Sequence, residues 1–185
     1  DATTQVIDAT GKLLLPGVID DHVHFREPGL THKADMLSET RAALAGGVTS
    51  FMDMPNTKPQ TTSLIEWKNK MAIAQQKALV NYAFYIGATN ENLQELKQAD
   101  FSKIPGVKLF MGSSTGNMLV DDERSLDKIF SEIKTIIAVH CEDEQTIRKN
   151  LAIYKEKYGD EIPFSCHPKI RSEEACYKST SYAVD

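Results

Sequence analysis

Short apolar runs alternate with amphipathic segments along this chain. Residues 13–19, 48–54, 81–88, 106–111 and 136–141 are apolar runs of strand length. The first is expected to form a buried strand that continues to about residue 26. Helices are predicted for residues 32–46, 63–80, 91–99, 125–135 and 143–158 and from about residue 172, with a loop at 159–171. This alternation predicts parallel strands joined by right-handed crossovers.

The ends of the predicted helices carry recognisable signals. Ser63 is expected to cap the second helix, with Glu66 three residues later completing the capping-box pattern. Gly46 and Gly47 are expected to stop the first helix. The segment at residues 112–116 is small and polar, which is typical of a loop between a strand and a helix.

The predicted strands begin at intervals of about 30 residues, the length of one unit of a (β/α)₈ barrel. Polar side chains follow at least three of these strands, where the active sites of barrel enzymes lie. An open doubly wound sheet is the alternative, although it would gather its ligands around one crevice. We therefore predict an α/β fold consisting of the first five βα units of a (β/α)₈ TIM barrel. Five units cannot close a barrel, so an open sheet edge is expected.

His22, His24 and Arg26 occupy alternate positions where the first strand ends. Alternate side chains of a strand point to the same face, so the two imidazoles could bind one metal ion. Arg26 could then hold an anionic substrate beside that metal. Asp20, just before the histidines, could orient an imidazole or reach the metal. The alternative is a half-exposed polar face without a metal.

Three further positions carry candidate chemistry. Lys108 lies among apolar neighbours in the fourth strand; burial would lower its pKa, although its amine could instead reach solvent at the strand end. His140 ends the fifth strand and is either a metal ligand or a hydrogen-bonded core histidine. Glu142 should share its face, whereas Cys141 should point away. Asn56 follows the second strand and by itself predicts only a turn.

Composition excludes several classes of function. The 185 residues suffice for a domain with a real core, and the net charge of −5 without a basic stripe argues against nucleic-acid binding. The apolar runs are too short to span a membrane. Three cysteines without paired spacing favour free thiols in a reducing compartment, and hence the cytoplasm. Residues 1–12 are mostly polar and predict the end of a preceding small β module, followed by the partial barrel at 13–185.

Four segments together carry a family resemblance. They are DDHVHFREPG at residues 20–29, MPNT at 54–57, GVKLFMG at 106–112 and AVHCED at 138–143. In this order they resemble the cyclic amidohydrolases, and most closely the dihydroorotases. Members of that family are usually much longer, so the resemblance implies the N-terminal part of a catalytic domain.

The resemblance implies a metal-dependent hydrolase that interconverts dihydroorotate and N-carbamoyl-L-aspartate in pyrimidine biosynthesis. Two Zn²⁺ ions per site are expected, bound by His22, His24, Lys108 carboxylated by CO₂, and His140. Arg26 and Asn56 would bind the carboxylate of the substrate. A further histidine ligand and a proton-shuttling aspartate are expected beyond residue 185.

Other functions stay open at this point. An allantoinase, or a dihydropyrimidinase of the hydantoinase type, could use the same scaffold. Such enzymes generally lack or change the arginine that matches Arg26. A non-catalytic relative that serves as an assembly partner would usually have lost the His-x-His pattern, and a structural zinc site would favour cysteine-rich ligands. The expected partner is a small-molecule substrate, without nucleic acid or membrane, and a homodimer is left open.

Overall fold

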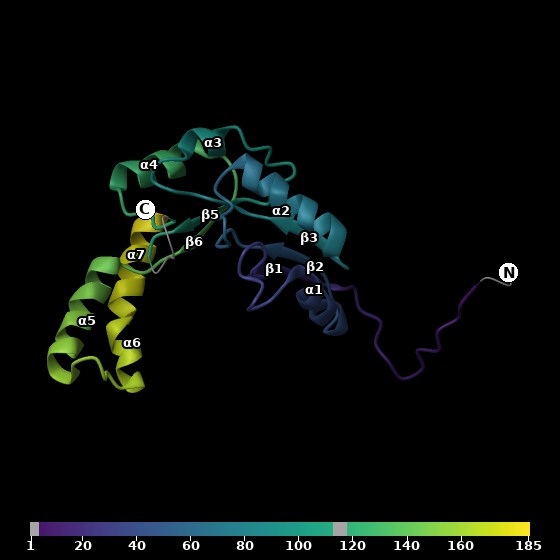
Figure 1. The fold of residues 1–185 in the computed structure, drawn as a ribbon, viewed down its shortest axis with the longest axis horizontal. Coiled ribbons are helices and arrows are strands. Elements are labelled where there is room, and N and C mark those ends of the chain that lie inside the picture. The colour runs from purple at the N-terminus through teal and green to yellow at the C-terminus, as the bar shows by residue number, and fades with distance from the viewer. Residues whose placement is uncertain (1–3, 113–117) are drawn as a thin grey trace.

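The computed structural model describes residues 4–112 and 118–185. The loop predicted at 112–116 therefore lies, apart from its first residue, outside the described residues. Two three-stranded parallel sheets form the centre of the molecule (Figure 1). The first contains β1 (Val18–Val23), β2 (Val48–Asp53) and β3 (Asn81–Phe84), and the second contains β4 (Ile86–Gly87), β5 (Val107–Phe110) and β6 (Ile137–His140).

One stretch of chain links the two sheets, because β3 pairs with β2 and β4 pairs with β5. At the junction, the Tyr85 amide donates to the Asp53 carbonyl at 3.1 Å, and the Ile86 amide donates to the Gly106 carbonyl at 3.3 Å. The six strands of the described residues are therefore all parallel and follow each other in chain order across the two sheets, an arrangement called the strand wall below. A doubly wound sheet would reverse this order at a switch point, so the prediction of a partial barrel is confirmed.

Side-chain caps define where most of the helices begin. The helices are α1 (Met36–Ala45), α2 (Leu64–Lys77), α3 (Leu93–Lys97), α4 (Glu123–Glu132), α5 (Glu144–Tyr158), η1 (Phe164–Cys166), α6 (His167–Ile170) and α7 (Glu173–Val184). Five of them have an Asp or Ser whose side chain accepts the amide three residues later, namely Asp35, Ser63, Asp122, Asp143 and Ser172. In Figure 1, α2, α3 and α4 lie along the same side of the strands.

Two helix predictions need correction. The first helix begins at Met36 and not at residue 32, because Asp35 provides the cap and residues 31–33 form a turn. The predicted loop at 159–171 contains η1 and α6. There, Pro168 occupies the first turn of α6, where its missing amide hydrogen is not needed. The cap by Ser63 is confirmed, since its side chain accepts the Glu66 amide at 3.2 Å.

The buried core lies where the helices cover the strands. One cluster surrounds β4 and β5, and it includes Ile86, Leu109 and Ile129, each no more than 1% exposed. A second cluster contains the aromatic residues Phe51 and Phe84 beside β2 and β3. Burying a side chain of this size contributes about 1.5–3 kcal/mol. The two clusters hold β2 to β5 in place, and these strands carry part of the candidate site at their carboxyl ends.

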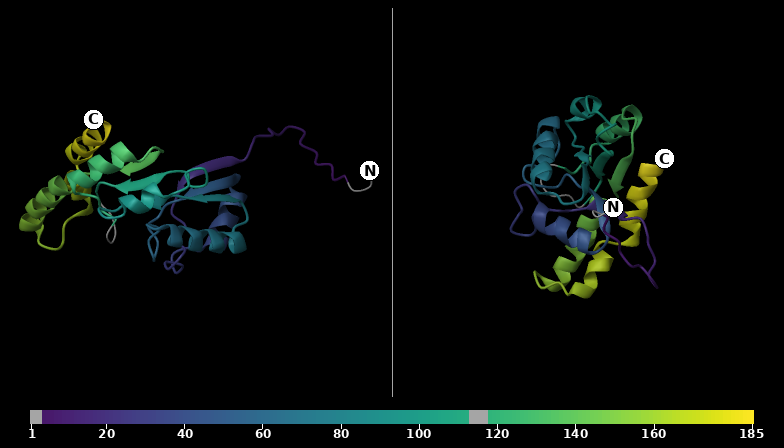
Figure 2. Two further views of the ribbon diagram at one scale, coloured as in Figure 1. Left: turned by 90° about the horizontal axis from the view of Figure 1, so that it is seen from above. Right: turned by 90° about the vertical axis from the view of Figure 1, so that its right-hand side faces the viewer.

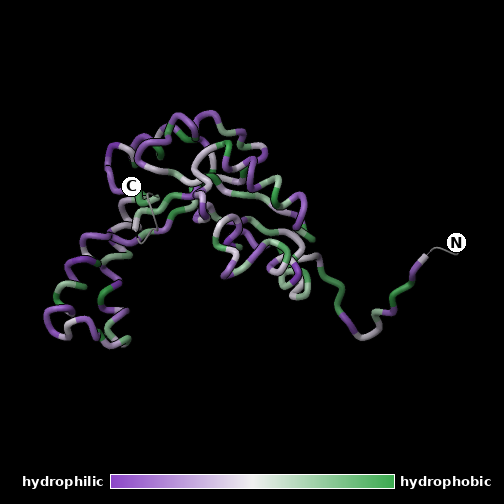
Figure 3. The backbone as a smooth tube through the Cα atoms, viewed as in Figure 1, coloured by the Kyte–Doolittle hydropathy of each residue, from purple (hydrophilic) through white to green (hydrophobic). Residues whose placement is uncertain are grey.

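The prediction that residues 13–19 are buried is wrong in this structure. Leu14 is 93% exposed, Val18 55% and Ile19 62%. Within the described residues β1 pairs with β2 alone, so little packs on it. The segment before β1 projects from the body as an extended arm with apolar stretches (Figures 2 and 3). Residues 4–12 contain no strand, and their assignment to a preceding β module stays a prediction. No helix in the described residues is long and apolar enough to cross a membrane.

Candidate metal centre

Two imidazoles stand side by side where β1 ends. His22 is in the strand and His24 follows it directly, and the centroids of their rings are 5.3 Å apart with the planes tilted by 52°. Because alternate side chains of a strand point to the same face, the sequence predicted that the two imidazoles lie on one side. The pairing of β1 with β2 shifts register between Asp20 and Val23, so the strand is irregular next to the first histidine.

The surroundings of both imidazoles favour their neutral form. Burial is the main cause that lowers the pKa of His22, and the charges of Lys108 and His24 lower it further. Burial also lowers the pKa of His24, although a hydrogen bond with Asn56 partly opposes this. The positive charges of Arg26 and Lys108 also lower the pKa of His24. A neutral imidazole has the free lone pair that metal coordination requires.

Lys108 is a buried residue of β5. It is 2% exposed, and its neighbours Val107 and Leu109 are fully buried. The amine stands 4.9 Å from the centroid of the Phe110 ring. Burial lowers the pKa of Lys108 and so favours the neutral amine. The alternative drawn from composition, that the amine reaches solvent, is therefore wrong.

Asn56 fixes the orientation of one imidazole. Its Oδ1 lies 2.7 Å from Nδ1 of His24. An amide oxygen can only accept, so Nδ1 carries the proton and Nε2 keeps its lone pair. Metal-binding histidines commonly donate their second ring N–H to such an acceptor. The family resemblance implied that Asn56 binds substrate, and this contact with His24 was not foreseen.

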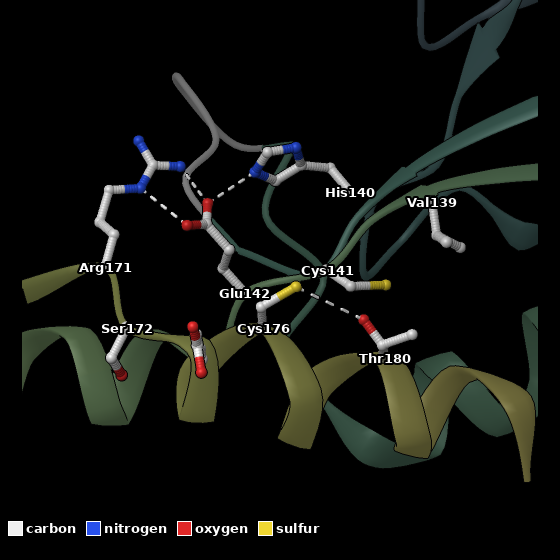
Figure 4. Close-up of a pocket in the computed structure, with 9 residues that line it drawn as sticks. Val139, His140, Cys141, Glu142, Arg171, Ser172, Cys176 and Thr180 are labelled. Carbon is white, nitrogen blue, oxygen red and sulfur yellow. Dashed lines mark hydrogen bonds and ion pairs between the residues drawn. The ribbon is translucent and has the colours of Figure 1, made fainter. Parts of the chain in front are cut away.

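His140 is held by a carboxylate at the end of β6. Its Nε2 lies 2.8 Å from Oε2 of Glu142, and the Arg171 guanidinium forms an ion pair with the same carboxylate (Figure 4). Arg171 Nε donates to Oε1 of Glu142 at 2.7 Å. Because a carboxylate accepts, Nε2 of His140 carries a proton, and its Nδ1 is left as the ring atom able to bind a metal. These side chains line a hollow of about 610 Å³ between β6 and α7.

Arg26 follows the histidines in an unusual backbone conformation. Its φ angle is 61°, in the left-handed region that residues other than glycine rarely adopt. Its carbonyl accepts the Leu30 amide at 3.0 Å. The chain therefore turns sharply two residues after His24, and the simple alternation of a strand ends there. Backbone strain of this kind costs about 1–3 kcal/mol and is frequent at binding sites.

The structure brings three of the four predicted ligands near one another. Lys108 acts electrostatically on both His22 and His24, although it comes from a distant part of the sequence. The ring of Phe110 lies next to the Lys108 amine and 6.2 Å from the His140 ring, whose Nε2 faces Glu142. Among the described residues, no three His, Cys, Asp or Glu side chains are grouped closely enough to hold a metal ion. Two imidazoles with lowered pKa values and a buried amine are donors that a metal ion can use, although the carboxylates of Asp20, Asp21 and Asp53 also act on the imidazoles and raise their pKa values.

Comparison with known proteins gives a consistent result. Residues 11–169 match the model of a family described as dihydro-orotase-like. A dihydroorotase of Methanosarcina acetivorans is 36% identical over 96% of this chain and 38% of its own length. An allantoinase of Desulfitobacterium hafniense is 31% identical over 98% of this chain and 42% of its own length. The chain thus spans about two fifths of these curated relatives.

A solved structure shares the same arrangement. The L-hydantoinase (dihydropyrimidinase) of Arthrobacter aurescens superposes with a TM-score of 0.89 at 29% identity. The match covers 96% of this chain and 40% of that protein. The strand wall therefore corresponds to part of a barrel.

Proposed function

Because the chain belongs to the dihydro-orotase-like family, we propose that it supplies the first five βα units of a metal-dependent dihydroorotase. Such an enzyme adds water to the ring amide of dihydroorotate: OH joins the carbonyl carbon, the C–N bond breaks, and the ring nitrogen gains hydrogen. N-carbamoyl-L-aspartate results, and the reverse closure releases water. The single observation that supports this proposal best is the gathering of His22, His24 and the buried Lys108.

We propose His22, His24, carboxylated Lys108 and His140 as the ligands of two Zn²⁺ ions. Bound zinc would lower the pKa of a water and polarise the ring carbonyl. Lys108 must lose a proton before its amine can attack CO₂, and burial favours that form. The products are a lysine carbamate with one negative charge and a proton. Asn56 keeps Nε2 of His24 available, and Glu142 does the same for Nδ1 of His140.

Arg26 is proposed to bind the carboxylate of the substrate. A guanidinium fits two carboxylate oxygens, and the effect of the Arg26 charge on His24 supports a position beside the proposed metals. Asn56 would assist through its amide nitrogen, since its oxygen is used by His24. A further histidine and an acid–base aspartate are expected from segments that this chain does not contain. Its three free cysteines agree with work in a reducing compartment such as the cytoplasm.

The second candidate is an allantoinase or hydantoinase. It is favoured by the 31% identity with an allantoinase and by the TM-score of 0.89 with an L-hydantoinase. Dihydroorotate carries a carboxylate on its ring, whereas hydantoin and allantoin do not. The positive charge of Arg26 could pair with the carboxylate of dihydroorotate but finds no such group on hydantoin or allantoin. Arg26 therefore favours the first candidate.

The test uses a polypeptide of the relatives' full length that contains this chain. It is assayed with dihydroorotate, allantoin and hydantoin, and its metal content is measured by elemental analysis. Dihydroorotate should be the preferred substrate, and Lys108→Ala should abolish both activity and metal binding. Lys103→Ala is the matched control, because the Lys103 side chain is 69% exposed. Two metals retained per site in Lys108→Ala would refute the proposed role of Lys108 as a metal ligand, and a preference for hydantoin would refute dihydroorotate as the substrate.

A further inference from the structure

A buried ion pair lies behind the candidate metal centre. Lys70 reaches inward from α2, and its Nζ lies 2.6 Å from Oδ2 of Asp53 on β2. Both side chains are fully buried. The amine also donates to the Met54 carbonyl at 2.8 Å and stands 4.9 Å from the centroid of the Phe84 ring. None of the predicted site residues is part of this pair.

The second oxygen of the carboxylate points to the histidine segment. Asp53 Oδ1 accepts the backbone N–H of Phe25 at 2.9 Å, and Phe25 is the residue between His24 and Arg26. Directly beside it, the Met54 amide donates to the Val23 carbonyl at 2.9 Å. The end of β1 is therefore attached to the end of β2 on both sides of His24.

These hydrogen bonds between β1 and β2 lie next to a sharp turn of the chain. Arg26 has the strained φ of 61°, and Glu27 directly after it is buried. Glu27 accepts the Met36 amide at 2.8 Å and forms an ion pair with Lys77. Lys77 lies two helical turns after Lys70 on the same helix, so α2 holds the segment through two lysine–carboxylate contacts.

We propose that Lys70 and Asp53 form a positioning pair for His24 and Arg26. Lys70 fixes the Asp53 carboxylate, and that carboxylate fixes the Phe25 amide, which sets the direction of the side chains on either side. This inference rests on the proposed function, since it concerns proposed ligands of the same site. Both side chains are fully buried and neither is a proposed ligand, so the pair acts through His24 and Arg26 and is not catalytic.

A merely structural role is the competing explanation. Removing one partner of a buried ion pair leaves an unpaired charge and destabilises a fold whatever else the pair does. Single variants therefore cannot separate the two roles. Removing both charges while keeping or deleting the hydrogen-bond acceptor can do so. Lys70→Met/Asp53→Asn keeps an oxygen for the Phe25 amide, whereas the matched Lys70→Met/Asp53→Leu deletes it.

The experiment uses this chain, labelled with ¹⁵N, and two readouts. The side-chain ¹⁵N shifts of His24 report which ring nitrogen carries the proton in the metal-free chain. A Co²⁺ titration followed by absorbance reports metal affinity. The Asn double variant should match the parent chain in both. The Leu double variant should lose the Nδ1–H preference and bind Co²⁺ about tenfold or more weakly, as for other partners that orient metal ligands.

Each outcome decides between the explanations. A folded Leu double variant with unchanged His24 shifts and Co²⁺ affinity would overturn the proposal. If that variant does not fold, hydrogen exchange of the Phe25 amide in the parent decides, because exchange as fast as in an unbonded amide would also overturn it. A parent chain that binds no Co²⁺ would contradict the proposed metal site, and the His24 shifts would still test the positioning pair.

Discussion

Replacing the buried Lys108 with methionine should stabilise the metal-free chain while removing its metal binding. Lys108 is 2% exposed, so its ammonium form loses hydration on folding. Burying an unpaired neutral polar group costs about 1–3 kcal/mol in proteins, and burying a charged group costs more. The Phe110 ring, 4.9 Å from the amine, returns about 2 kcal/mol because the contact is desolvated. Methionine is similar in length and needs no partner, so Lys108→Met should raise the free energy of unfolding by about 1 kcal/mol or more at pH 7.

The pH dependence of this difference provides a second check. Burial lowers the pKa of Lys108 in the folded chain from its usual 10.5. Between the lowered pKa and 10.5 the unfolded chain binds more protons than the folded chain, so the stability of the parent rises with pH in that window. Below the lowered pKa the unfavourable contribution is full and constant. The advantage of Lys108→Met should therefore shrink as the pH approaches 10.5.

Urea unfolding at several pH values measures these effects. A chelator and CO₂-free buffer keep the chain free of metal and the lysine free of carbamate. Lys103→Met is the control, because its side chain is 69% exposed and its surface ion pair with Asp100 is worth at most about 1 kcal/mol. Loss of more than about 1 kcal/mol in Lys108→Met at pH 7, or an advantage that grows with pH, would refute the reasoning from burial.

Two further predictions concern a histidine and a helix cap. In metal-free chain, the His24 imidazole should titrate below its usual pKa of 6.5, and Asn56→Ala should lower that pKa further because it removes the hydrogen bond that favours the charged ring. NMR titration measures this, and an unchanged or higher pKa in Asn56→Ala would contradict it. Ser63→Ala should cost about 1 kcal/mol by urea unfolding, since the Glu66 amide loses its acceptor. The exposed Gln76→Ala in the same helix should cost far less, and equal losses would show that the cap contributes nothing specific.

The order of the elements could be predicted from local patterns. Apolar runs act within a few residues, so they located the strands and, with the amphipathic segments between them, most helices, and Ser63 was the one cap predicted from the sequence. The pairing of His22 with His24 on one side also followed from alternation within one strand. Each of these features depends on neighbours in the sequence, and that is why the sequence alone determined them.

The tertiary structure decided which polar groups meet. His24 and Asn56 are 32 positions apart, and Arg171 and Glu142 are 29 apart. No local pattern singles out Lys70 in the sequence, yet it is buried against Asp53. The exposure of β1 also depended on which strands lie beside it, and not on its own apolar composition. Burial and ion pairing are properties of the assembled strand wall, because they require side chains from remote segments to occupy the same space.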